Sequence, residues 1–120
     1  MRGLTLIVAS LDARRFHAAL SIAAASAAAG AATRLYLQEA AVALLAAPVS
    51  SPDDATHRAL GLPTLAQMLG EALGLGVNII ACQSGLVMAT LSAEALDPRI
   101  EVGGLVGLFA TLGDDRLVTV

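Results

Sequence analysis

Short runs of apolar, largely β-branched residues constrain the fold of this chain more than any other feature. Residues Leu4–Ala9 and Val77–Ala81 have the length of single strands, and each is apolar on both alternating faces. Runs of this kind are typical of parallel strands that are buried on both sides of a sheet. An all-β barrel or sandwich is disfavoured, because only 2% of the residues are aromatic.

A membrane segment is the alternative explanation for so much apolar sequence. Residues 72–93 carry no charge and are long enough to cross a bilayer at ~1.5 Å per residue. However, this stretch contains glycines and polar residues at a density unsuited to a membrane helix, and the alanine-rich residues 16–33 are only weakly hydrophobic. We therefore expect no membrane segment, and a cytoplasmic location in which a single cysteine stays reduced.

The composition is short of charge for a chain of 120 residues: 57% are apolar and 14% are charged. Ordinary domains have roughly 45–50% apolar and about 25% charged residues, so disorder is excluded. The length predicts a single domain over residues 1–120. A net charge of −3 and the absence of Trp argue against nucleic-acid binding. We expect the surplus apolar faces, at residues 16–33 and 84–93, to form contacts between subunits.

The order of elements follows from these apolar runs and from the residues that begin or end helices between them. Asp12 and Thr64 are candidate N-caps, whereas Gly30 and Pro48 are candidate stops. The expected strands are residues 4–9, 33–37, 77–81, 100–102 and 116–120, and the expected helices are residues 13–29, 39–47, 64–73, 84–90 and 104–112. Alternation of this kind predicts a three-layer α/β/α fold with a five-stranded, mainly parallel sheet.

Ligand sites in parallel sheets form beyond the carboxyl ends of the strands. In this sequence those ends carry Ser10, Gln38-Glu39, Cys82-Gln83-Ser84 and Gly103-Gly104. Only the third set contains a nucleophile. A thiol between a strand and a helix N-terminus is stabilised as a thiolate, so we predict Cys82 as the catalytic residue, with Gln83, Ser84 and Ser10 as anion or helix-cap support. The alternative is that Cys82 is an inert, buried core residue.

Other candidate sites are weaker. No Cys/His cluster has zinc spacing, and Gly103–Gly107 lacks the pattern of a dinucleotide-binding turn, so we expect neither a metal nor a cofactor. Close packing of a helix on a strand is the preferred explanation for the Gly103-Gly104 pair. His57 lies in the loop-like residues 48–63 and is either a solvated histidine or a proton shuttle, if that loop folds over Cys82.

Several segments resemble the DsrE/DsrF-like (TusD-related) family of small sulfur-relay proteins. The most specific is Val77–Met88, in which a strand ends in Ala81-Cys82-x-Ser84 and a Met-containing helix follows. The segments Ile100–Gly104 and Asp115–Val120 and the opening strand, with its alanine-rich helix, extend the likeness over nearly the whole chain.

The resemblance implies that Cys82 accepts sulfur as a persulfide and passes it on between a donor and an acceptor protein. It also implies a homo-oligomer, either a trimer or a hexamer. Relay members of the family carry arginines in the helix after the cysteine, whereas residues 86–90 here are uncharged. The leading hypothesis is thus a persulfide carrier, and the alternative is a non-catalytic interaction or small-ligand-binding module with a structural cysteine.

Overall fold

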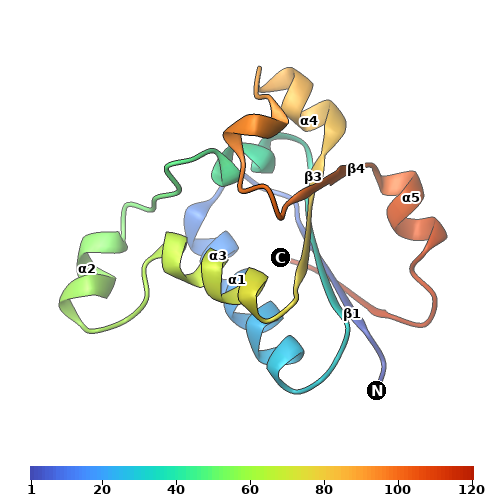
Figure 1. Ribbon diagram of the computed structural model, residues 1–120, viewed down its shortest axis with the longest axis horizontal. Coiled ribbons are helices and arrows are strands. Elements are labelled where there is room, and N and C mark those ends of the chain that lie inside the picture. The colour runs from blue at the N-terminus through green and yellow to red at the C-terminus, as the bar shows by residue number, and fades with distance from the viewer.

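The computed structural model describes residues 1–120 as one α/β unit (Figure 1). Helices and strands alternate along most of the chain, as the sequence predicts. The elements are β1 (Leu4–Val8), α1 (Ala13–Ala28), β2 (Thr33–Leu37), the 3₁₀ helix η1 (Glu39–Leu45), α2 (Asp54–Ala59), α3 (Leu65–Gly74), β3 (Asn78–Cys82), α4 (Gln83–Met88), the 3₁₀ turn η2 (Ala93–Ala95), β4 (Glu101–Gly103), α5 (Leu105–Ala110) and β5 (Arg116–Thr119).

The sheet has five strands in the order β4-β3-β2-β1-β5. All neighbouring pairs are parallel, so the sequence prediction of an α/β fold is confirmed. The register places Tyr36 opposite Ile80, and Cys82 opposite Gly103. Because side chains alternate along a strand, Tyr36, Ile80, Cys82 and Gly103 share one face of the sheet.

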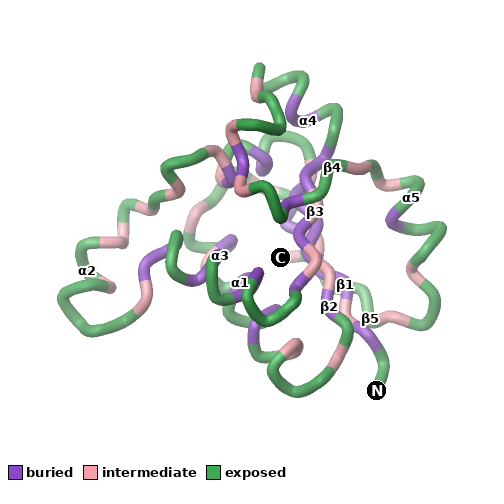
Figure 2. The backbone as a smooth tube through the Cα atoms, viewed as in Figure 1, coloured by how far each residue is buried: buried purple, intermediate pink, exposed green.

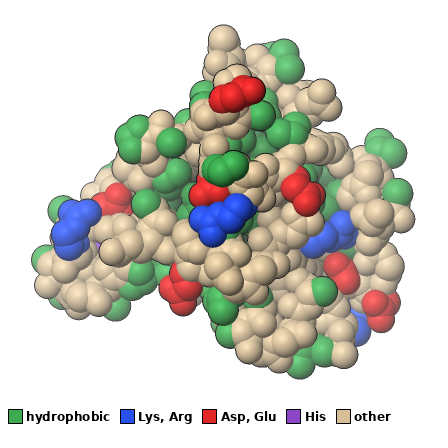
Figure 3. Space-filling view, in the orientation of Figure 1, with side chains coloured by type: hydrophobic (Ala, Val, Ile, Leu, Met, Phe, Trp, Pro, Cys, Tyr) green, Lys and Arg blue, Asp and Glu red, His purple; other side chains and the backbone are tan.

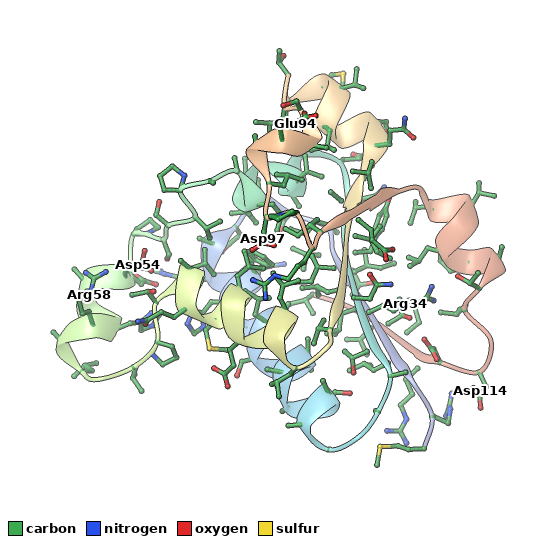
Figure 4. All side chains as sticks on the ribbon, viewed as in Figure 1. Arg34, Asp54, Arg58, Glu94, Asp97 and Asp114 are labelled. Carbon is green, nitrogen blue, oxygen red and sulfur yellow. The ribbon has the colours of Figure 1, made fainter.

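Helices lie on both faces of the sheet, which gives three layers (Figure 1). One face is covered by α1, which packs on β1, β2 and α3. On the other face lies α5, which is hydrogen-bonded to Arg34 of β2 (Figure 4): the guanidinium donates to the Thr111 hydroxyl and to the Leu108 carbonyl. The core is a single cluster in which Phe16, Leu35 and Ile79 have no exposed surface. Figure 2 shows buried residues along β1, β2 and β3 and exposed ones over most of α2 and α5.

Helix ends follow the predicted chemistry. The Asp12 carboxylate accepts from the backbone N–H groups of Arg14 and Arg15 in the first turn of α1, and Thr64 forms a capping box with Gln67 at the start of α3. After α1, Gly30 has a φ of 100°, a conformation that favours glycine. No helix combines the length and hydrophobicity that crossing a bilayer requires.

Two differences from the sequence prediction bear on the site. The segment expected as a helix over residues 39–47 is a 3₁₀ helix over Glu39–Leu45 that packs against α4, and its first residue, Glu39, has a positive φ. The third strand extends to Cys82 rather than ending at Ala81. Cys82 therefore belongs to the sheet and is also the N-cap of α4, which ties the thiol to two elements at once.

Candidate functional site

Cys82 lies in the wall of an open cavity at the carboxyl edge of the sheet. The residue is 4% exposed, and the cavity beside it measures about 520 Å³. None of the lining side chains is charged. They come from the ends of β2 and β3, from α4 and from the turn into α5: Tyr36, Gln38, Cys82, Gln83, Ser84, Val87, Gly103, Gly104 and Leu105.

Gly103 helps to keep this cavity open. It pairs with Cys82 across β3 and β4 and faces the same side of the sheet. A Cβ atom at this position would approach Ile80 Cγ2 to 3.2 Å, and any larger side chain would extend from there into the space beside the thiol. The glycine therefore serves close packing and access to Cys82. A Cβ at Gly104 would meet nothing within 4 Å.

Four hydrogen-bond donors converge on the sulfur of Cys82. Ser84 Oγ lies 3.3 Å from Cys82 Sγ, and the backbone N–H of Gly85 donates to Sγ over 3.4 Å. The Tyr36 hydroxyl from β2 and the backbone N–H of Glu39 from η1 are two further donors near the sulfur, and both lower the pKa of the thiol. The donors thus come from three different elements, none of which brings a cation to the sulfur.

These donors outweigh the cost of burying the thiol. Burial raises the pKa of Cys82, but the donors of Ser84, Tyr36 and the two backbone N–H groups lower it by more than burial raises it. The net result is a pKa of about 7, below the ordinary value of 9.0. Each bond is stronger to the thiolate than to the thiol and so favours the charged form. A larger share of Cys82 is therefore thiolate at neutral pH than of a cysteine with the ordinary pKa.

Tyr36 can act only as a donor in this site. Its residue is 1% exposed, and burial together with its hydrogen bond to Cys82 raises the pKa of the phenol well above its usual range. The hydroxyl consequently keeps its proton while the thiol ionises. A sulfur anion at Cys82, or on an atom bound to it, is the group that this arrangement stabilises.

The structure brings together most of the residues that the sequence nominates. Ser84 bonds the thiol, and Gln83 lines the same cavity. Gln38 lines it too, and its buried Oε1 has no hydrogen-bond partner.

Ser10 is not brought to the thiol, contrary to the expectation of anion support. It follows β1, which is separated from β3 by β2, so at ~4.8 Å between neighbouring strands it lies too far from Cys82. The Ser10 hydroxyl is buried without a hydrogen-bond partner, and it does not cap α1, a role that Asp12 takes.

His57 does not reach Cys82 either, so it cannot act there as a proton shuttle. It lies in α2, at the left of Figure 1 and away from α4 at the top, and its ring packs against His17 with a centroid distance of 4.6 Å. An ion pair between Arg14 Nε and Asp53 Oδ2, at 2.7 Å, connects the start of α2 to α1. The loop of residues 48–63 therefore folds along α1 rather than over the thiol.

Two site residues were not found from the sequence. Tyr36 sits inside a strand, and only the register of β2 against β3 shows that it faces the same side as Cys82. The alternation of side chains along a strand was the available signal, because Tyr36 lies two positions before Gln38 and therefore faces the same side of the sheet. Glu39 was noted as a strand-end residue, but its contribution is a backbone N–H, for which the sequence carries no signal.

Comparison with known proteins shows the fold. No protein-family model matches the chain, and no curated protein sequence matches it. Among solved structures, the ychN protein from E. coli is similar over 100% of both chains, with a TM-score of 0.75 and 18% identity. MTH1491 from Methanobacterium thermoautotrophicum, described as of unknown function, also matches over 100% of both chains, with a TM-score of 0.69 and 15% identity.

A third structure, the conserved protein of unknown function BT1422 from Bacteroides thetaiotaomicron, matches 97% of this chain and 94% of its own, with a TM-score of 0.65 and 18% identity. The chain is thus similar in fold, over nearly its whole length, to small α/β proteins from distant organisms. At these identities the likeness concerns the fold alone, so function has to be argued from the site.

Proposed function

We propose that this protein is a small sulfur carrier that accepts sulfur as a persulfide on Cys82. The observation that carries the proposal is the convergence of four uncharged donors on one buried thiol in the wall of an open cavity. A merely structural cysteine has no need of donors that stabilise its anion. The resemblance of Val77–Met88 to the DsrE/DsrF-like segment supports the same function.

The proposed transfer needs no cofactor and no external oxidant. The Cys82 thiolate attacks the outer sulfur of a donor persulfide, R–S–SH, and forms a new S–S bond. The bond between the two donor sulfurs breaks, and its electron pair leaves on R–S⁻, which takes up a proton. The product is Cys82–S–SH, and attack by an acceptor thiolate on its outer sulfur returns Cys82 to the thiolate.

The same donors suit the product as well as the reactant. A persulfide anion at Cys82 would place its charge one sulfur further into the cavity, which the side chains of Ser84 and Tyr36 also line. Sulfur donor and acceptor proteins are the proposed partners, and the cytoplasm is the proposed location.

Mass spectrometry of the intact protein tests this proposal directly. After incubation with glutathione persulfide, the wild-type chain should gain the mass of one sulfur atom and release one equivalent of glutathione. Cys82→Ser should gain none. Addition of a reductant should remove the extra sulfur and restore the original mass. No gain in the wild type, or an equal gain in Cys82→Ser, would contradict the function.

A non-catalytic interaction module is the second candidate, and one observation favours it. Apolar side chains stand exposed on α4, where Val87 and Met88 are 74% and 86% accessible, as a docking face would require. In that case Cys82 is an ordinary core residue and should react slowly at neutral pH. Thiol titration in the folded state separates the two candidates, because a structural thiol titrates near or above ~8.5.

A further inference from the structure

The backbones of η1 and α4 touch at one point beside the thiol. Gly85 is buried, and the atoms nearest to a Cβ built on it all belong to the backbone of Glu39, with whose carbonyl group it would collide. Glu39 itself has a φ of 50°, in the left-handed region that residues with a side chain rarely adopt. An unusual backbone conformation and a glycine-only contact thus coincide at the same place.

This contact orients two of the four donors. Glu39 is the first residue of η1 and Gly85 is the third residue of α4. The backbone N–H of Gly85 donates to Cys82 Sγ over 3.4 Å, and the backbone N–H of Glu39 lowers the pKa of the same thiol. Two N–H groups from separate elements can meet at one sulfur only where the two backbones approach this closely. A residue with a Cβ at position 85 would hold η1 away from the sulfur.

We infer that Glu39 and Gly85 are positioning residues for Cys82, which act through their backbones: the contact between them holds the N–H of Gly85 on the sulfur and the first residue of η1 beside it. Neither side chain is required. The left-handed conformation of Glu39 costs free energy in isolation, and the packing of η1 on α4 maintains it. The inference deepens the proposed function, on which its importance for sulfur transfer rests.

Gly85→Ala is the first test, with Gly70→Ala as its matched control. Both glycines lie inside helices, but a Cβ at Gly70 meets nothing within 4 Å. The readout is the pKa of the only cysteine, from the ultraviolet absorbance of its thiolate against pH. Gly85→Ala should raise this pKa from about 7 by about one unit, the worth of one lost hydrogen bond to an anion, whereas Gly70→Ala should leave it unchanged.

A pair of substitutions at Glu39 separates the backbone from the side chain. Glu39→Val should raise the pKa of Cys82, because a β-branched residue disfavours the left-handed conformation. Glu39→Gly removes the same carboxylate but accommodates a positive φ, and it should not raise the pKa. An equal rise in both variants would assign the effect to the side chain and overturn the inference.

If Gly85→Ala does not fold, the pKa of Cys82 in the two Glu39 variants still tests the inference. An unchanged pKa in a folded Gly85→Ala protein would also overturn the inference. Sulfur acceptance is measured separately by mass. A raised pKa in a chain whose wild type takes up no sulfur would support the positioning role while contradicting the proposed function.

Discussion

At the scale of single residues, the chemistry of Cys82 depends on neutral donors. The thiol is almost fully buried, which by itself would suppress ionisation, yet its pKa lies at about 7. Two hydroxyls, from Ser84 and Tyr36, and two backbone N–H groups account for the difference. All of these donors are uncharged, so hydrogen bonds stabilise the thiolate without a cation at the sulfur.

Alkylation of the thiol by iodoacetamide should follow this pKa. Because the thiolate is the nucleophile, we expect the rate to rise with pH through a midpoint near 7, well below the ordinary 9.0. Ser84→Ala should move the midpoint upward by about one unit through loss of one hydrogen bond. Ser21→Ala, at an exposed serine of α1, is the control. A wild-type midpoint near 9.0 would show that the donors do not act on the sulfur.

At the scale of elements, the site is made where β2 and β3 end beside each other. The chain turns directly into η1 after β2 and into α4 after β3, and these two short helices pack together over the sheet edge. Away from the site, Asp54 at the start of α2 accepts hydrogen bonds from the backbone N–H groups of Ser51 and Leu65 (Figure 4). One carboxylate therefore connects the loop, α2 and α3.

The stability of this connection should depend on pH. The backbone hydrogen bonds from Leu65 and Ser51 lower the pKa of Asp54 below its ordinary 3.8, so its contribution is complete above that value and is lost as the pH falls through the lower, folded-state value. Asp54→Asn keeps only one acceptor oxygen and should lower the free energy of unfolding at neutral pH by about 1 kcal/mol. Urea denaturation in a series of buffers measures both effects.

The control for Asp54 is Asp114→Asn, at an exposed carboxylate in the turn before β5 (Figure 4). We expect this variant to unfold like the wild type at neutral pH. Equal stability of the Asp54 and Asp114 variants would show that the two backbone hydrogen bonds to Asp54 contribute nothing net.

At the scale of the whole molecule, the low charge of the sequence appears as exposed apolar surface. Met88 on α4 is 86% exposed, Ile22 on α1 is 46% exposed, and all four residues of the edge strand β5 are accessible. On the face drawn in Figure 3, charged side chains are few and scattered among hydrophobic and other atoms. Burial against further copies of the chain would remove such surface from water.

We propose that the faces at residues 16–33 and 84–93 form the contacts of a homo-oligomer, and Met88→Asp tests this. A charge in such a contact should weaken association at least about tenfold, because burying it unpaired costs more than about 1.4 kcal/mol. Val106→Asp on α5 is the matched control, since Val106 is 87% exposed but lies outside both faces. Sedimentation velocity gives the masses, and a monomeric wild type would contradict the proposal.

Local pattern was enough for the larger part of the fold. The strand over residues 33–37, the caps at Asp12 and Thr64 and the parallel α/β class follow from apolar runs and from residues that stop or start helices, all of which act over a few neighbours. The 3₁₀ form of residues 39–45 could not be read in this way, because it depends on packing against α4.

What the sequence determined by itself is the layered parallel sheet and the place of Cys82 at a strand end, since both follow from short-range hydrophobic periodicity. Only the tertiary structure decided which groups surround the sulfur. It excluded Ser10 and His57 and supplied Tyr36 and the Glu39 backbone. The physical reason is that a hydrogen bond forms within about 3.5 Å, so the partners of Cys82 depend on strand register and on the contact of η1 with α4, neither of which a local pattern encodes.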